Sequence, residues 1–146
     1  MILIHELSHV YSPGTVFEKK ALDHVDLKIE DGEILGIIGH TGSGKSTLIQ
    51  HLNGLLKPTE GAVYFNGEDI HDKDFSMKKL RSKIGLVFQY PEHQLFESTV
   101  IEDVQFGPKN MGLDPLEMEM RSFEALKQVG MGEEYLDVCP LELSGG

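Results

Sequence analysis

One glycine-rich segment and its two neighbours restrict the possible folds of this chain more than any other feature. Residues 39–47 read GHTGSGKST, which satisfies the pattern G-x-x-x-x-G-K-[ST]. The residues before it, 33–38, are nearly all apolar, as in a strand that is buried on both faces of a parallel sheet. The residues after it, 45–56, place leucines at helical spacing. A strand, a glycine-rich loop and a helix in this order predict an α/β fold with a phosphate-binding loop.

The residue types in this loop suit a nucleotide with its metal ion. Glycines let consecutive backbone N–H groups turn inward around phosphate oxygens, and the positive end of the following helix points at the same place. We expect Lys45 to reach the terminal phosphates and to act in catalysis, and the Ser46 hydroxyl to bind Mg²⁺. The predicted cofactors are therefore ATP and Mg²⁺. The predicted binding residues in the loop are Gly39, His40, Thr41, Gly42, Ser43, Gly44, Lys45, Ser46 and Thr47.

Most of the remaining N-terminal part has the pattern of β-strands. Apolar and polar residues alternate in residues 2–10 and 22–29, which favours two antiparallel strands. Asn66-Gly67 between two apolar segments predicts a hairpin. The apolar run at residues 84–88 predicts another strand that is buried on both faces.

The C-terminal part has the pattern of helices instead. A short basic helix over residues 76–82 precedes it, and residues 99–106 and 114–129 are predicted to be helical. The last of these helices carries an apolar stripe that we expect in the core, formed by Leu116, Met120, Phe123 and Leu126. We therefore predict two parts, a β subdomain with an incomplete phosphate-loop core at residues 1–88 and a helical subdomain at residues 89–146.

Composition and charge exclude several classes of protein. Lys and Arg number 13 against 24 Asp and Glu, and the net charge of −11 argues against nucleic acid as a partner. A single cysteine, Cys139, rules out an internal disulfide. The N-terminus lacks the basic start of an export signal, and no apolar run is long enough to cross a bilayer, so we expect a cytosolic location.

Two further features of the sequence are weak evidence for a function when each is taken alone. Gln89 follows the predicted strand at residues 84–88, and ligands of open α/β sheets bind at the carboxyl ends of strands. Gln89 is thus a candidate Mg²⁺ ligand or a group that orients the attacking water, although a glutamine at a strand end is also a common solvated loop residue. The chain closes with Leu143, Ser144, Gly145 and Gly146, which alone would suit a flexible linker.

Taken together, the phosphate loop, Gln89 and the terminal LSGG resemble the ATPase subunits of ABC transporters, and this resemblance covers the whole chain. In that family LSGG is the signature motif, which closes over the γ-phosphate of ATP held by a partner subunit. The resemblance implies this role for Leu143, Ser144, Gly145 and Gly146. It also implies an antiparallel β subdomain, a helical subdomain and catalytic groups on strands that follow the signature and are absent here. We expect the parent subunit to be an ATPase and this chain alone to be inactive.

Several segments resemble one branch of the family, the energy-coupling-factor or cobalt importer ATPases. They are YSPGT at 11–15, FEKKAL at 17–22, VFQYPEHQLF at 87–96 and FGPKNMG at 106–112. The resemblance implies import of vitamins or metal ions from the cytoplasmic face of the membrane. It also implies a second ATPase subunit (a heterodimer or a homodimer), a substrate-binding membrane component and a transmembrane coupling subunit. The coupling subunit would dock between Tyr90 and Val100, where Leu95 and Phe96 are the expected apolar contacts. Packing of these side chains onto the chain's own core is the alternative.

The resemblance also assigns a base-binding residue. Tyr11 matches the aromatic residue that stacks on adenine, and Phe17 is a rival for that role. A purely structural role for Tyr11 at the end of a strand is the third possibility.

Two alternative functions stay open at this point. The chain could belong to a nucleotide-binding module that does not hydrolyse ATP, or to another ABC-type ATPase such as a chromosome-structure or DNA-repair protein. The second alternative is disfavoured by the acidic composition and by the short stretch between Gln89 and Leu143, which leaves no room for a long coiled-coil insertion.

Overall fold

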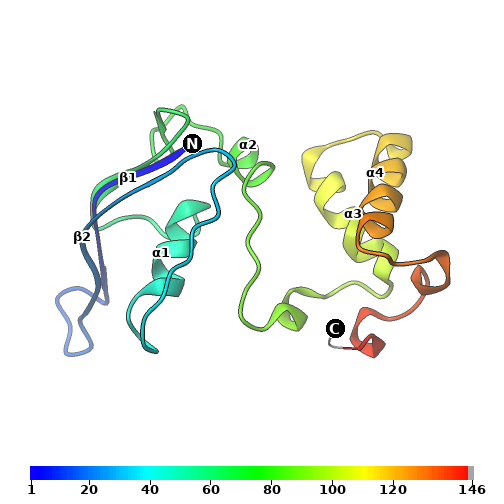
Figure 1. Ribbon diagram of the computed structural model, residues 1–146, viewed down its shortest axis with the longest axis horizontal. Helices are drawn as coiled ribbons and strands as arrows, with labels where there is room; N and C mark the ends of the chain where they lie inside the picture. The colour runs from blue at the N-terminus through cyan, green and yellow to red at the C-terminus, as the bar shows by residue number, and fades with distance from the viewer. Residues whose placement is uncertain (145–146) are drawn as a thin grey trace. The chain divides into compact units, whose positions relative to one another are not determined.

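The computed structural model describes residues 1–144 and divides into two compact units (Figure 1). The first unit comprises Met1–Leu86, and the second begins at Val87. Each unit is described here by itself.

The first unit is built on a four-stranded antiparallel sheet. Its strands are β1 (Ile2–Tyr11), β2 (Lys19–Ile29), β3 (Glu60–Phe65) and β4 (Glu68–Asp69), in the order β2-β1-β3-β4. The central strand β1 pairs with β2 on one side and with β3 on the other, which confirms the antiparallel pair predicted from the alternating pattern (Figure 1).

The hairpin between β3 and β4 is the one that Asn66-Gly67 predicts. Both residues have left-handed backbone angles, with φ of 51° at Asn66 and 88° at Gly67. Two successive residues with positive φ are the requirement of a type I′ turn, whose twist matches that of the flanking strands. Phe65 and Glu68 pair directly across this turn.

Two helices complete the first unit. The helix α1 (Lys45–Leu52) follows the glycine-rich loop, and α2 (Met77–Arg81) begins after Ser76, whose hydroxyl accepts the Lys79 N–H at 3.3 Å. The helix α1 is shorter than predicted because Gly54, with φ of 67°, turns the chain just after its end. The core of this unit consists of Ile4, Leu7, Leu22, Leu48, Val63, Ile70 and Leu80.

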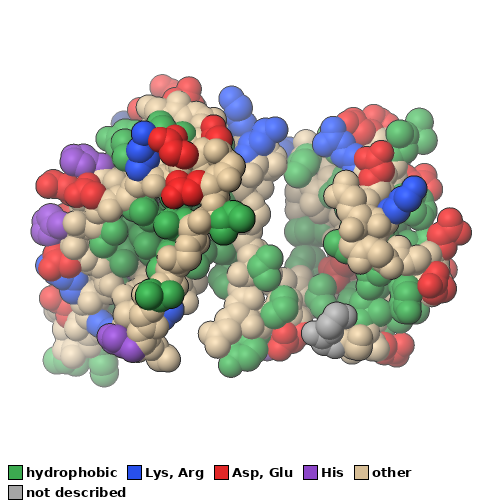
Figure 2. Space-filling view, in the orientation of Figure 1, with side chains coloured by type: hydrophobic (Ala, Val, Ile, Leu, Met, Phe, Trp, Pro, Cys, Tyr) green, Lys and Arg blue, Asp and Glu red, His purple; other side chains and the backbone are tan. Residues whose placement is uncertain are grey.

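The prediction of two strands that are buried on both faces of a parallel sheet is wrong for this structure. Neither residues 33–38 nor residues 84–88 form a strand, and Ile34 and Ile38 are 99% and 96% exposed. A strand of this type exists only between neighbours that bond its backbone and cover its two faces. Among the described residues no strand pairs with either segment, so neither segment is part of the sheet. Apolar side chains consequently contribute to the visible surface of the first unit (Figure 2).

The second unit is helical, as predicted. The helix α3 (Val100–Met111) begins at Thr99, whose hydroxyl accepts the Glu102 N–H at 3.4 Å, and it extends past the predicted end at residue 106. The helix α4 (Pro115–Gln128) begins at Asp114, whose carboxylate accepts the N–H groups of Leu116 and Glu117, both at 3.1 Å. Short 3₁₀ turns lie at Pro91–Gln94, Glu133–Tyr135 and Pro140–Glu142.

The predicted core stripe of α4 is correct at one end of the helix only. Leu126 is buried at 5% exposure, whereas Leu116 and Met120 are 67% and 57% exposed and Phe123 is at the border of exposure. Within the second unit the described residues cover the C-terminal end of this helix and leave its first two turns open. No helix among residues 1–144 combines the length and the apolarity that a membrane span requires.

Candidate functional site

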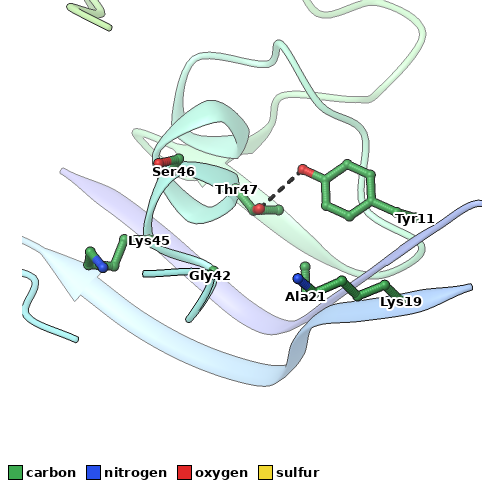
Figure 3. Close-up of a pocket in the computed structure, with 8 residues that line it drawn as sticks. Tyr11, Lys19, Ala21, Gly42, Lys45, Ser46 and Thr47 are labelled. Carbon is green, nitrogen blue, oxygen red and sulfur yellow. Dashed lines mark hydrogen bonds between the residues drawn. The ribbon is translucent and has the colours of Figure 1, made fainter. Parts of the chain in front are cut away.

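A small pocket in the first unit brings together residues from β1, β2, the glycine-rich loop and α1 (Figure 3). Its volume is about 170 Å³. Tyr11 at the end of β1 and Lys19 at the start of β2 form one side, and the loop and the first turn of α1 form the other. The complete lining is Tyr11, Lys19, Ala21, Gly42, Gly44, Lys45, Ser46 and Thr47.

The backbone of the loop requires glycine at two of these positions. Gly42 and Gly44 have φ of 81° and 92°, in the left-handed region that favours glycine. Gly44 also packs directly on β2, because a Cβ at this position would lie 2.4 Å from the carbonyl oxygen of Ala21. The loop therefore rests against β2 through bare backbone.

The ammonium group of Lys45 lies over the loop. Its Nζ donates to the carbonyl oxygens of Gly39 at 2.7 Å and His40 at 2.9 Å, and lies 3.5 Å from the Ser43 hydroxyl. These partners are neutral, so an anion in the pocket would compete well for the same protons. The loop thus holds a cation in place, and no carboxylate among residues 1–144 forms an ion pair with it.

The N-terminus of α1 adds positive potential at the same place. Gly44 occupies the cap position and offers no side chain to bond the first free N–H groups of the helix, and the first turn contains no acidic residue. Ser46, whose hydroxyl is the predicted Mg²⁺ ligand, lies in this turn and lines the pocket. The arrangement suits a phosphate group.

Tyr11 is tied to the loop helix and to a buried histidine pair. Its hydroxyl lies 3.1 Å from the Thr47 hydroxyl, and its ring packs edge-on against His9 with centroids 4.6 Å apart. The side chain is 38% exposed, so part of the ring is open to the pocket that it lines. Phe17, the rival candidate, is 81% exposed and is not among the lining residues.

The histidine pair was not predicted from the sequence. His51 is fully buried, its Nδ1 donates to the Thr47 carbonyl oxygen at 2.7 Å, and its Nε2 lies 3.2 Å from Nδ1 of His9. Burial lowers the pKa of His51, so the neutral form is favoured. The four-residue spacing from Thr47 to His51 was the available signal, since it places both residues on one face of the helix.

The other predicted site residues lie elsewhere or outside the description. Gln89 is exposed in the second unit, just before the 3₁₀ turn Pro91–Gln94, and its role beside the loop stays a prediction. His40 contributes its carbonyl oxygen to Lys45. Leu143 and Ser144 follow the 3₁₀ turn Pro140–Glu142, with Ser144 exposed, whereas the predicted signature glycines Gly145 and Gly146 lie outside the described residues.

Solved structures that are similar to this chain share its fold. The structure of cbiO1 from Clostridium perfringens, part of the ABC transporter complex cbiONQ, matches with a TM-score of 0.78 and 41% identity, covering 98% of this chain and 55% of that one. A dimeric bacterial ABC transporter cassette matches with a TM-score of 0.83 and 33% identity, covering 99% of this chain and 64% of that one. These matches confirm the predicted α/β fold class of ABC-type ATPases.

Curated relatives and a family profile agree with the structures. Two proteins named energy-coupling factor transporter ATP-binding protein EcfA2, from Clostridium acetobutylicum and Caldanaerobacter subterraneus, are 56% and 54% identical over 99% of this chain. The chain spans about half of their length, 51% in each case. The profile that describes the ABC transporter family matches residues 22–146, which include the whole phosphate loop. The chain therefore belongs to the ABC transporter family.

Proposed function

We propose that this chain is the nucleotide-binding part of an ATPase subunit that drives an energy-coupling-factor type importer. The observation that carries the proposal is the loop itself: an ammonium group and an uncapped helix N-terminus converge on one pocket without a neutralising carboxylate in its lining. The printed names of the relatives support the transporter type.

Each residue of the site has a task that follows from its chemistry. Lys45 exchanges its bonds to the Gly39 and His40 carbonyl oxygens for bonds to the terminal phosphates, and the loop N–H groups bind the phosphate oxygens between them. Tyr11 offers its partly open ring to the adenine base. Gln89 orients the attacking water.

The Mg²⁺ ion would be held by few protein groups. Among the described residues no three His, Cys, Asp or Glu side chains are placed to hold a metal ion together, which fits Mg²⁺ bound mainly by nucleotide oxygens and water. The Ser46 hydroxyl in the first turn of α1, and Gln89, are the proposed protein ligands. When bound, the ion would neutralise negative charge on the phosphates.

The proposed partners follow the family arrangement. A second ATPase subunit receives the signature motif of Leu143, Ser144, Gly145 and Gly146. The transmembrane coupling subunit docks between Tyr90 and Val100, where Leu95 and Phe96 are 39% and 62% exposed. A substrate-binding membrane component selects a vitamin or a metal ion such as cobalt, and the ATPase lies at the cytoplasmic face of the membrane.

Calorimetric titration with magnesium ATP and a phosphate-release assay test the proposal on the full-length protein. We expect binding and turnover that Lys45→Ala removes, with Lys73→Ala as an exposed control. Binding without any release of phosphate would instead favour a nucleotide-binding module that does not hydrolyse. Equal behaviour of Lys45→Ala and the unmodified protein would refute the assignment of the site.

A further inference from the structure

A second lysine faces the phosphate-loop pocket from the opposite wall. Lys19 is the first residue of β2, and the strand register pairs it with Tyr11. Its Nζ lies 3.9 Å from the position that a Cβ on Gly42 would occupy, so the ammonium group reaches over the loop. In Figure 3 the side chain points from β2 toward the loop, on the Tyr11 side of the pocket.

Lys19 differs from its neighbour Lys20 in its electrostatic surroundings. Within residues 1–144 no carboxylate forms an ion pair with it, whereas its neighbour Lys20 pairs with Asp23 at 3.0 Å. The pocket lining contains two lysines and the N-terminus of α1, but no Asp or Glu. A chain with a net charge of −11 thus contains a pocket of positive potential, and two like charges at one pocket are stabilised when an anion lies between them.

We propose that Lys19 is a second phosphate-binding cation of the nucleotide site, an inference that rests on the proposed function. Along the pocket Lys19 lies on the side of Tyr11, the proposed base-binding residue, and Lys45 lies on the side of the loop. Lys19 therefore binds the phosphate nearest the nucleoside, and Lys45 binds the terminal phosphates. A contact to the first phosphate is available to ATP and ADP alike.

The test compares two adjacent lysines on one strand. Lys19→Gln removes the pocket charge, and Lys20→Gln removes an equal charge that is paired with Asp23 outside the pocket. We expect Lys19→Gln to weaken the binding of both magnesium ATP and magnesium ADP about tenfold, the usual effect of one hydrogen bond to a charged group. Lys20→Gln should change either affinity less than twofold. Lys19→Arg should restore most of the loss, since a guanidinium also binds phosphate.

Titration calorimetry on the full-length protein measures these affinities at low and moderate salt. Lys19 is an exposed strand residue, so circular dichroism should show unchanged folding for all three variants. Equal affinities of Lys19→Gln and Lys20→Gln, with binding still abolished by Lys45→Ala, would overturn the inference and leave the proposed function intact. Absence of nucleotide binding by the unmodified protein would overturn both.

Discussion

Replacement of Gly44 by alanine should damage the phosphate loop more than any other glycine substitution in it. The left-handed backbone at φ of 92° costs a residue with a Cβ about 1–2 kcal/mol. The added Cβ would also lie 2.4 Å from the Ala21 carbonyl oxygen and 3.1 Å from Leu22 Cδ2. Because backbone and a buried side chain must both move, we add the usual cost of overpacking, about 1–3 kcal/mol. The expected loss in the free energy of unfolding is therefore about 2–5 kcal/mol.

Alanine substitutions at two other glycines separate the cost of backbone strain from the cost of close packing. Gly42→Ala meets the same backbone strain at φ of 81° but open space, since its nearest neighbour is the flexible end of Lys19 at 3.9 Å, so about 1–2 kcal/mol is expected. Gly36→Ala meets neither strain nor contact and should stay within about 0.5 kcal/mol of the original chain. Urea denaturation followed by circular dichroism gives the three values. If Gly44→Ala costs no more than Gly42→Ala, the close packing of the loop on β2 is refuted.

Other predictions concern pH, capping and packing. Burial lowers the pKa of His51 below its ordinary 6.5, so the unfolded chain binds a proton that the folded chain does not, and stability should be complete above about pH 6.5 and fall below it. His51→Gln should flatten this fall in thermal unfolding, and parallel curves would contradict the assignment. Asp114→Ala should cost about 1 kcal/mol in urea denaturation because it frees two N–H groups of α4, whereas Asp114→Asn should cost much less. Leu126→Ala should cost about 2–4 kcal/mol and the exposed Leu116→Ala less than about 0.5 kcal/mol, and similar values for both would contradict the burial pattern.

Local signals made much of the fold predictable. The Asn66-Gly67 turn acts within a few residues, and the strands β1 and β2 are neighbours along the chain, so the sequence contains most of the cause of both. The strands expected at residues 33–38 and 84–88 depend on partners far away, and hydrophobicity cannot say whether such partners are present. The predicted burial of Leu116 and Met120 on α4 was wrong for the same reason. Helical spacing identifies an apolar face of a helix but does not show which element covers that face.

Some features of the site could likewise be predicted from local sequence, whereas others depend on contacts between distant residues. The conformation of the glycine-rich loop was predictable because its backbone shape demands glycine at set positions and places one lysine within reach, whereas phosphate binding by the loop stays a prediction. The position of Lys19 at the pocket was not predictable from the sequence. Lys19 lies there because the strand register pairs it with Tyr11, and that register includes several shifts along β1 and β2. The contact between His51 and His9 was not predictable either, because the two residues are on different elements.

A chain with a negative net charge can contain a positive pocket because salt limits the distance over which charges act. In solutions of about 0.1 M salt, exposed charges are screened over about 10 Å, so the many carboxylates spread over the surface contribute little at the loop (Figure 2). A phosphate in the pocket would meet Lys45, Lys19 and the end of α1. Net charge therefore predicts the partners of a whole surface, whereas the ligand of a pocket is decided by the few groups that line it. Because both lysines line the pocket, we expect nucleotide affinity measured by titration calorimetry to fall only modestly with added salt, and less steeply in Lys19→Gln than in the unmodified protein.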